Sequence, residues 1–124
     1  MSELTRSQSW SKGALESVLA QKGKLESKYR TLCMKMPALI HQAGLVQATV
    51  FMLGREADIG KQFIDDLAKV YGGFGDAIKL LHLIQEAPLA EYMALTHDLS
   101  QVSLWFRRFA QIELAPAKEN EREP

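Results

Sequence analysis

The chain has a single cysteine, Cys33, and little else that marks a specialised class of protein. One cysteine cannot form an internal disulfide framework, and this low cysteine content fits a reducing compartment. The first six residues, MSELTR, lack the apolar core of a secretory signal peptide. We therefore expect a cytoplasmic protein.

The chain also lacks an excess of charge of either sign, since 15 Lys and Arg balance 15 Asp and Glu. Within that balance, residues 1–35 hold seven basic and three acidic side chains, whereas residues 56–98 hold three basic and eight acidic ones. Such a split can make a dipolar subunit that stacks head to tail or turns one face to an anion. The same split is also compatible with solvated helix faces that have no binding role.

Charge is absent altogether from residues 36–54, MPALIHQAGLVQATVFMLG. A membrane span needs about 20 mainly apolar residues with few helix breakers, and this run contains Pro37, His41, Gln42 and Gly44. A helix that is apolar all round belongs inside a core. The run therefore predicts a central helix over residues 45–53, buried on nearly all sides.

A phosphate-binding loop is not indicated by the residues that follow the run. Five residues separate Gly54 from Gly60, whereas the phosphate loop requires four, and Gln62 stands where Ser or Thr would reach the metal. With that spacing the backbone amides do not converge on a phosphate. We expect no nucleotide site there.

The other apolar positions recur at helical spacing, and no segment alternates as a strand would. The pattern predicts a helix over about 4–21 and a second helix from Leu25 to Ala43, with a kink or break near Lys35–Pro37. Gly44 is expected to end it. Further helices are expected after Asp58, after Asp76 and from Pro88. We predict an all-α, compact single-domain bundle of about six helices over 1–115, and a disordered charged tail over 116–124.

Catalytic and metal-binding constellations are scarce in the sequence. His82 and Glu86 share a helix face at i and i+4, but no second pair completes a metal site. Cys33 lies on an apolar stripe without a nearby histidine, which predicts a buried and inert thiol. We expect no enzyme activity, no cofactor and no metal. A small helical enzyme or metal carrier would have to use His82 and Glu86.

Binding is what the remaining charged residues favour. Lys24, Lys28 and Lys35 fall at i, i+4 and i+11, a row of ammonium groups that suits a phosphate backbone. Near the C-terminus two arginines follow Trp105, which lies off the apolar stripe and could contact a partner or a base. Alternatively, Trp105 packs and the arginines pair with acids. The candidate RNA-binding or interface residues are Lys22, Lys24, Lys28, Arg30, Lys35, Trp105, Arg107 and Arg108.

Two motifs carry a resemblance to a known family. The first comprises Tyr29-Arg30, Met36-Pro37, Leu39-Ile40, Gly44-Leu45, Gln47-Ala48 and Phe51, and the second is Trp105-Phe106-Arg107-Arg108-Phe109-Ala110. In order and spacing they resemble the small-subunit family of type III-B CRISPR effector complexes, the Cmr complexes. The resemblance covers roughly residues 25–110.

The resemblance implies a non-catalytic subunit. Copies of it would stack along the assembly, beside subunits that hold the guide RNA, and would help to line the channel where target RNA pairs with the guide. Its partners would be other subunits, copies of itself, and guide and target RNA, with no membrane. Arg107 and Arg108 match the family's basic pair, whereas Pro37, Gly44, Gln47 and Trp105 match motifs that we assign to the fold. The balanced charge departs from the family, which is often more basic. It is equally compatible with an alternative, a generic helical protein–protein adaptor without direct nucleic-acid contact.

Overall fold

The computed structural model describes residues 4–55, 58–72 and 75–117, and in these residues all regular structure is α-helical. The predicted all-α class is confirmed, with six helices in the described ranges. The tail predicted to be disordered is 116–124, and residues 118–124 of it lie outside the described ranges. The helices are α1 (Arg6–Leu19), α2 (Glu26–Ala43), α3 (Leu45–Leu53), α4 (Ile59–Gly72), α5 (Ala77–Glu86) and α6 (Leu89–Glu113).

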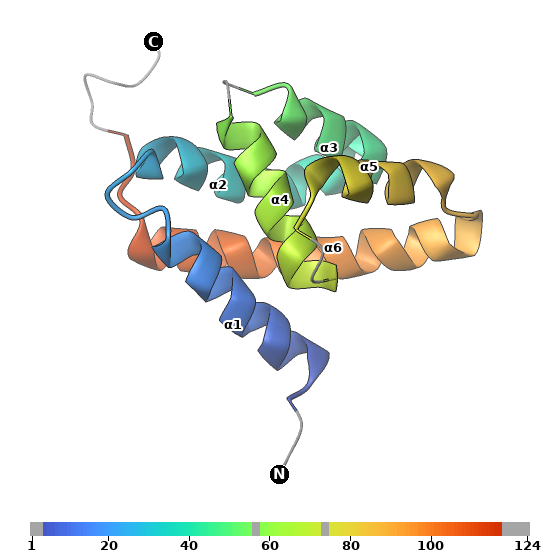
Figure 1. Cartoon of the computed structure of the whole chain (residues 1–124), viewed down its shortest axis with the longest axis horizontal. Helices are drawn as coiled ribbons and strands as arrows, with labels where there is room; N and C mark the ends of the chain where they lie inside the picture. Colours follow the sequence, from blue (N-terminus) through green and yellow to red (C-terminus); the bar gives the residue numbers. More distant parts are fainter. Residues whose placement is uncertain (1–3, 56–57, 73–74, 118–124) are drawn as a thin grey trace.

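The longest helix, α6, runs along the long axis of the molecule and packs against α1, α2 and α4 (Figure 1). Its 25 residues give it a length of about 37 Å at 1.5 Å per residue. Helix α2 runs antiparallel to it. At one end the Ala115 N–H donates to the Glu26 carboxylate at 3.0 Å, and at the other the Val46 N–H donates to the Tyr92 hydroxyl at 3.3 Å.

Aromatic side chains from three helices meet in the centre of the core. Tyr29 of α2 packs edge-on against Phe63 of α4, with ring centroids 5.7 Å apart, and Phe63 packs edge-on against Phe106 of α6 at 5.8 Å. All three side chains are completely buried. Edge-to-face pairs of this kind add to the hydrophobic gain from burial, so they join α2, α4 and α6.

Most of the predicted helix ends are confirmed, but α2 is not broken at Pro37. Its α-helix runs without interruption from Glu26 to Ala43 and includes the proline. Of the two predicted alternatives, a kink or a break, the break is therefore wrong. Tertiary packing of the apolar stripe offsets the single hydrogen bond that Pro37 removes. Gly44, with φ of 89°, ends the helix as expected, and the Asp76 side chain caps α5.

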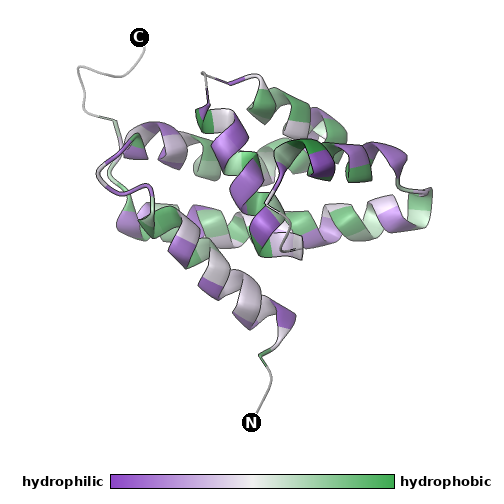
Figure 2. Ribbon diagram, viewed as in Figure 1, coloured by the Kyte–Doolittle hydropathy of each residue, from purple (hydrophilic) through white to green (hydrophobic). Residues whose placement is uncertain are grey.

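The prediction that α3 is buried on nearly all sides is wrong. Only one face lies in the core, while Val50 is 49% exposed and Phe51 is 44% exposed. Helix α3 packs against α2, α4 and α5, and no other element in the described part of the chain covers its outer side. Figure 2 shows that hydrophobic residues dominate α3. The buried face consists of Leu45, Ala48, Thr49 and Met52.

Candidate nucleic-acid interface

The lysines of the predicted row do not all lie on one helix. Helix α2 begins at Glu26, so Lys24 precedes it, in a turn where its N–H donates to the Gln21 carbonyl at 3.1 Å. Lys28 and Lys35 are both exposed on α2. Seven residues make about two helical turns, which places these two ammonium groups on the same face, about 10 Å apart along the axis. The helical row is therefore a pair, with Lys24 displaced into the turn.

Two other basic residues of this region are partly engaged within the protein. Lys22 forms an ion pair with Glu113 at 3.6 Å, which joins the α1–α2 turn to the end of α6. The Arg30 side chain is half-buried, and its buried Nε has no hydrogen-bond partner among the described residues. Exposed ion pairs contribute little to stability, so Lys22 can exchange Glu113 for another anion at small cost.

The aromatic and basic motif near the C-terminus is divided between interior and surface. Trp105 is half-buried and stacks on Phe109, with centroids 5.8 Å apart and an angle of 17° between the rings. Arg108 is exposed and Arg107 is half-buried. Neither arginine forms an ion pair with any residue in the described ranges. One ring face of Trp105 is thus used for packing, while Arg108 presents its charge to solvent.

The basic and acidic segments of the sequence are not opposite faces of the molecule. Arg6 pairs with Asp98, and the Tyr29 hydroxyl donates to Asp66 at 2.6 Å, so each segment contacts the other. Charge separation is clearer between the two ends of α6, which lie at opposite sides of the view in Figure 1. The end formed by the α1–α2 turn and the α6 C-terminus holds four basic residues, Lys22, Lys24, Arg107 and Arg108, against two acids, Glu26 and Glu113. The α5–α6 corner holds Glu86 and Glu91.

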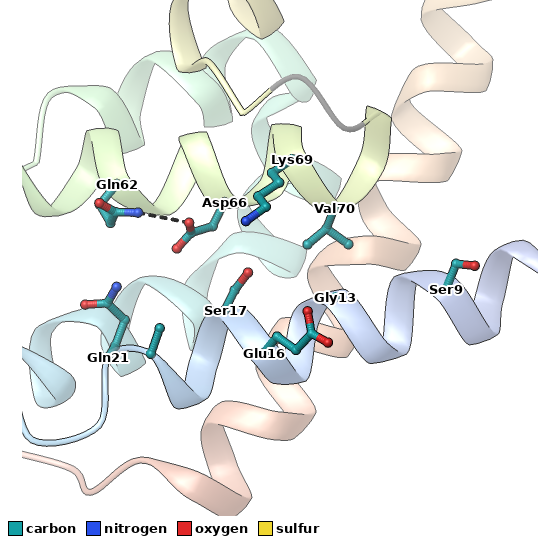
Figure 3. Close-up of a pocket in the computed structure, with 10 residues that line it drawn as sticks. Ser9, Gly13, Glu16, Ser17, Gln21, Gln62, Asp66, Lys69 and Val70 are labelled. Atoms are coloured by element: carbon teal, nitrogen blue, oxygen red, sulfur yellow. Dashed lines mark hydrogen bonds between the residues drawn. The ribbon is translucent and has the colours of Figure 1, made fainter.

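A polar groove of about 430 Å³ separates α1 from α4 (Figure 3). Ser17 of α1 and Gln21 of the following turn face Gln62, Asp66 and Lys69 of α4 across it. Sequence reasoning did not find this site, because the residues that form it lie more than 40 positions apart and no short motif links them.

Burial dominates the ionisation of the acid in that groove. Desolvation raises the pKa of Asp66, although hydrogen bonds from Tyr29 and from Gln62, the latter at 2.9 Å, oppose the rise by stabilising the carboxylate. Burial also raises the pKa of the Tyr29 hydroxyl and of the Cys33 thiol well above their ordinary values. Cys33 is completely buried, as predicted, and its raised pKa disfavours the reactive thiolate.

Metal-ligating side chains do not gather in the described residues. His82 and Glu86 are exposed on α5, and no group of three or more His, Cys, Asp or Glu side chains comes together within residues 4–55, 58–72 and 75–117. Within the same ranges no helix has the length and apolar character to cross a membrane. Within the described residues, the fold is that of a small all-α protein whose candidate residues lie mainly at the surface.

Comparison with known proteins identifies the family. Residues 6–113 match the family described as CRISPR-associated protein (Cas_Cmr5). The chain is 41% identical over 108 residues to the CRISPR system Cmr subunit Cmr5 of Thermus thermophilus, covering 86% of this chain and 94% of that protein. The chain therefore belongs to the Cmr5 family of CRISPR-associated proteins, and its resemblance to the small-subunit family of Cmr complexes is confirmed.

A solved structure shows the same fold. The crystal structure of a CRISPR-associated Cmr5 family protein from Thermus thermophilus matches with a TM-score of 0.86 and 38% sequence identity. The match covers 91% of this chain and 100% of the other. The six-helix arrangement is therefore a fold of the family.

Proposed function

We propose that this chain is a non-catalytic subunit of a type III-B Cmr effector complex and lines the channel in which guide RNA pairs with target RNA. The observation that carries the proposal is the family match over residues 6–113, together with a relative that is named as a Cmr subunit. In this function the subunit helps to build the channel and provides positive charge for the RNA backbone. Sequence recognition belongs to base pairing between the guide and its target.

The exposed cations supply the electrostatic part of the mechanism. Lys28 and Lys35 on α2 and Arg108 on α6 lie at the surface, with Lys24 in the adjacent turn. Each phosphate that such a side chain neutralises releases condensed counterions, which favours binding without regard to sequence. This fits a lining that must accept any guide–target duplex.

The two ends of the molecule support stacking of copies. At the basic end Leu19, Leu25 and Ile112 are exposed, by 43%, 55% and 72%, respectively. At the acidic α5–α6 corner Leu89 and Met93 are exposed, by 75% and 63%. An apolar, basic end and an apolar, acidic end are complementary. A contact between unlike ends repeats from copy to copy and builds a row along an assembly.

Charge reversal on the proposed RNA surface tests direct RNA contact. The double variant Lys28→Glu/Arg108→Glu should bind a guide–target duplex at least about tenfold more weakly, with a shallower dependence of log K on log salt, since each lost phosphate contact removes about 0.7–0.9 from that slope. Fluorescence anisotropy with labelled duplex at several salt concentrations measures both effects, and circular dichroism checks helix content.

The matched control is Lys12→Glu/Lys79→Glu, which makes the same change in charge with lysines exposed on α1 and α5. It should bind RNA nearly as well as the unmodified chain. The net charge of zero favours a second candidate, a protein–protein adaptor without RNA contact. If both double variants bind RNA like the unmodified chain, or both lose it equally, the lining proposal fails and the adaptor remains.

A further inference from the structure

Helix α3 carries apolar residues on two opposite faces. The inward residues Leu45, Ala48, Thr49 and Met52 follow the i, i+3, i+4, i+7 spacing of one helix face and are buried. The outward face repeats that spacing with Gln47, Val50 and Phe51, and Gly54 and Arg55 continue it at the helix end. A helix that faces water on one side ordinarily carries polar and charged residues there. The outward face of α3 instead places two large apolar side chains, Val50 and Phe51, between Gln47 and Arg55.

The outward face has a defined chemistry. Val50 and Phe51 leave 49% and 44% of their surface exposed. The Arg55 guanidinium lies over the Phe51 ring, 5.4 Å from its centroid, which places one positive charge beside the ring. Gln47 is exposed one turn before Phe51. Both belong to the motif that carries the family resemblance, yet the core does not use Gln47 and buries Phe51 only in part.

We propose that this outward face of α3, formed by Gln47, Val50, Phe51 and Arg55, docks an apolar surface of a different protein subunit that presents a carboxylate to Arg55. The inference rests on the proposed function, because it requires a multi-subunit assembly. The partner would bury the exposed halves of Val50 and Phe51, in the way that aromatic side chains anchor the centres of interfaces.

The charge of the α3 face favours a different protein subunit over the two alternatives, RNA and a second copy of this chain. RNA needs a row of cations, but residues 36–54 carry no charge and the face offers Arg55 alone. A second copy of this chain has its complementary apolar and acidic surface at the α5–α6 corner, where Glu86 and Glu91 lie. In the proposed stacking that corner meets the basic end of a neighbouring copy. The α3 face is left for another protein.

The test measures incorporation of variants into the complex. The Cmr complex is reconstituted from its remaining subunits with the double variant Val50→Gln/Phe51→Gln, and incorporation is titrated by size-exclusion chromatography. Apparent affinity should fall at least about tenfold relative to the unmodified chain, as expected for the loss of central anchors. The free variant should bind RNA duplex as before, and its thermal midpoint should change little because both side chains are half exposed. Arg55→Glu, which reverses the one charge of the face, should weaken incorporation in the same direction.

The control is Leu4→Gln, which removes an apolar side chain that is 56% exposed and precedes α1. It should be incorporated like the unmodified chain. Normal incorporation of both α3 variants would overturn the inference. It would also be overturned if they lost RNA affinity as free chains, or if they changed only the self-association measured by sedimentation, since these results assign the face to RNA or to a second copy. Failure of the unmodified chain to be incorporated would instead refute the proposed function.

Discussion

At the scale of single residues, the raised pKa of Asp66 can be tested by measuring how stability depends on pH. Its carboxylate lies at the α1–α4 groove and accepts hydrogen bonds from Tyr29 and Gln62, while burial raises its pKa. Asp76 provides a contrast within the same chain, because its carboxylate accepts the N–H groups of Ile78 and Lys79, which lowers its pKa. The two acids should therefore respond to pH with opposite sign.

The folded state binds the proton of Asp66 more tightly than the unfolded state does. The contribution of Asp66 to stability is therefore greatest below its ordinary pKa of 3.8 and is lost as the pH rises through the raised folded value. We predict that Asp66→Asn lowers the thermal midpoint more at about pH 4 than at about pH 7, relative to the unmodified chain.

Asp76→Asn is the control of opposite sign, because a lowered pKa stabilises the fold above pH 3.8 and loses that effect as the pH falls. Its difference from the unmodified chain should shrink toward low pH. Thermal unfolding of the three proteins between about pH 3 and pH 7 checks both trends. A difference for Asp66→Asn that is independent of pH would contradict the assignment.

At the scale of elements, the approach of α3 to α4 depends on Gly60. A Cβ atom on this residue would lie 1.9 Å from the Met52 carbonyl oxygen, so the two backbones would have to separate. Overpacking of this kind costs about 1–3 kcal/mol and sometimes more. We predict that Gly60→Ala lowers the free energy of unfolding by at least that amount, as measured by urea denaturation.

Gly54→Ala is the matched control, since the nearest atoms to its added Cβ lie at an ordinary contact distance of 3.6 Å and its φ of −84° suits any residue. It should be neutral or stabilise the protein by up to about 1 kcal/mol. If Gly60→Ala and Gly54→Ala lowered the free energy of unfolding equally, the close approach of α3 to α4 at Gly60 would be contradicted.

Much of the element structure was predictable because apolar spacing records which side of a helix faces the core. The C-terminal end of α2 was predictable from Gly44, whose positive φ ends the helix locally. The start of α5 was predictable from Asp76, whose side chain caps it. The outcome at Pro37 was not predictable, since packing of the whole stripe decides whether one lost hydrogen bond breaks a helix. The exposure of Val50 and Phe51 was also missed, because composition shows that a face is apolar but not which molecule covers it.

At the scale of the whole molecule, α6 separates two ends of unlike charge, and its antiparallel pairing with α2 brings Arg107 and Arg108 to the same end as the turn that holds Lys24. The sequence indicated these cations but not their environment. Lys22 meets Glu113, Arg30 is half-buried, and Trp105 stacks on Phe109. Such contacts depend on residues distant in the sequence, so spacing alone could not tell which side chains the fold itself engages.

The most direct test of the central claim is to purify the tagged chain from its own cell at moderate salt and to identify what accompanies it. A Cmr subunit should elute in a large complex that carries short guide-like RNAs, with more than one copy of this chain per complex as measured by native mass spectrometry. Recovery of the chain alone, free of other subunits and of nucleic acid, would contradict its assignment as a subunit of the effector.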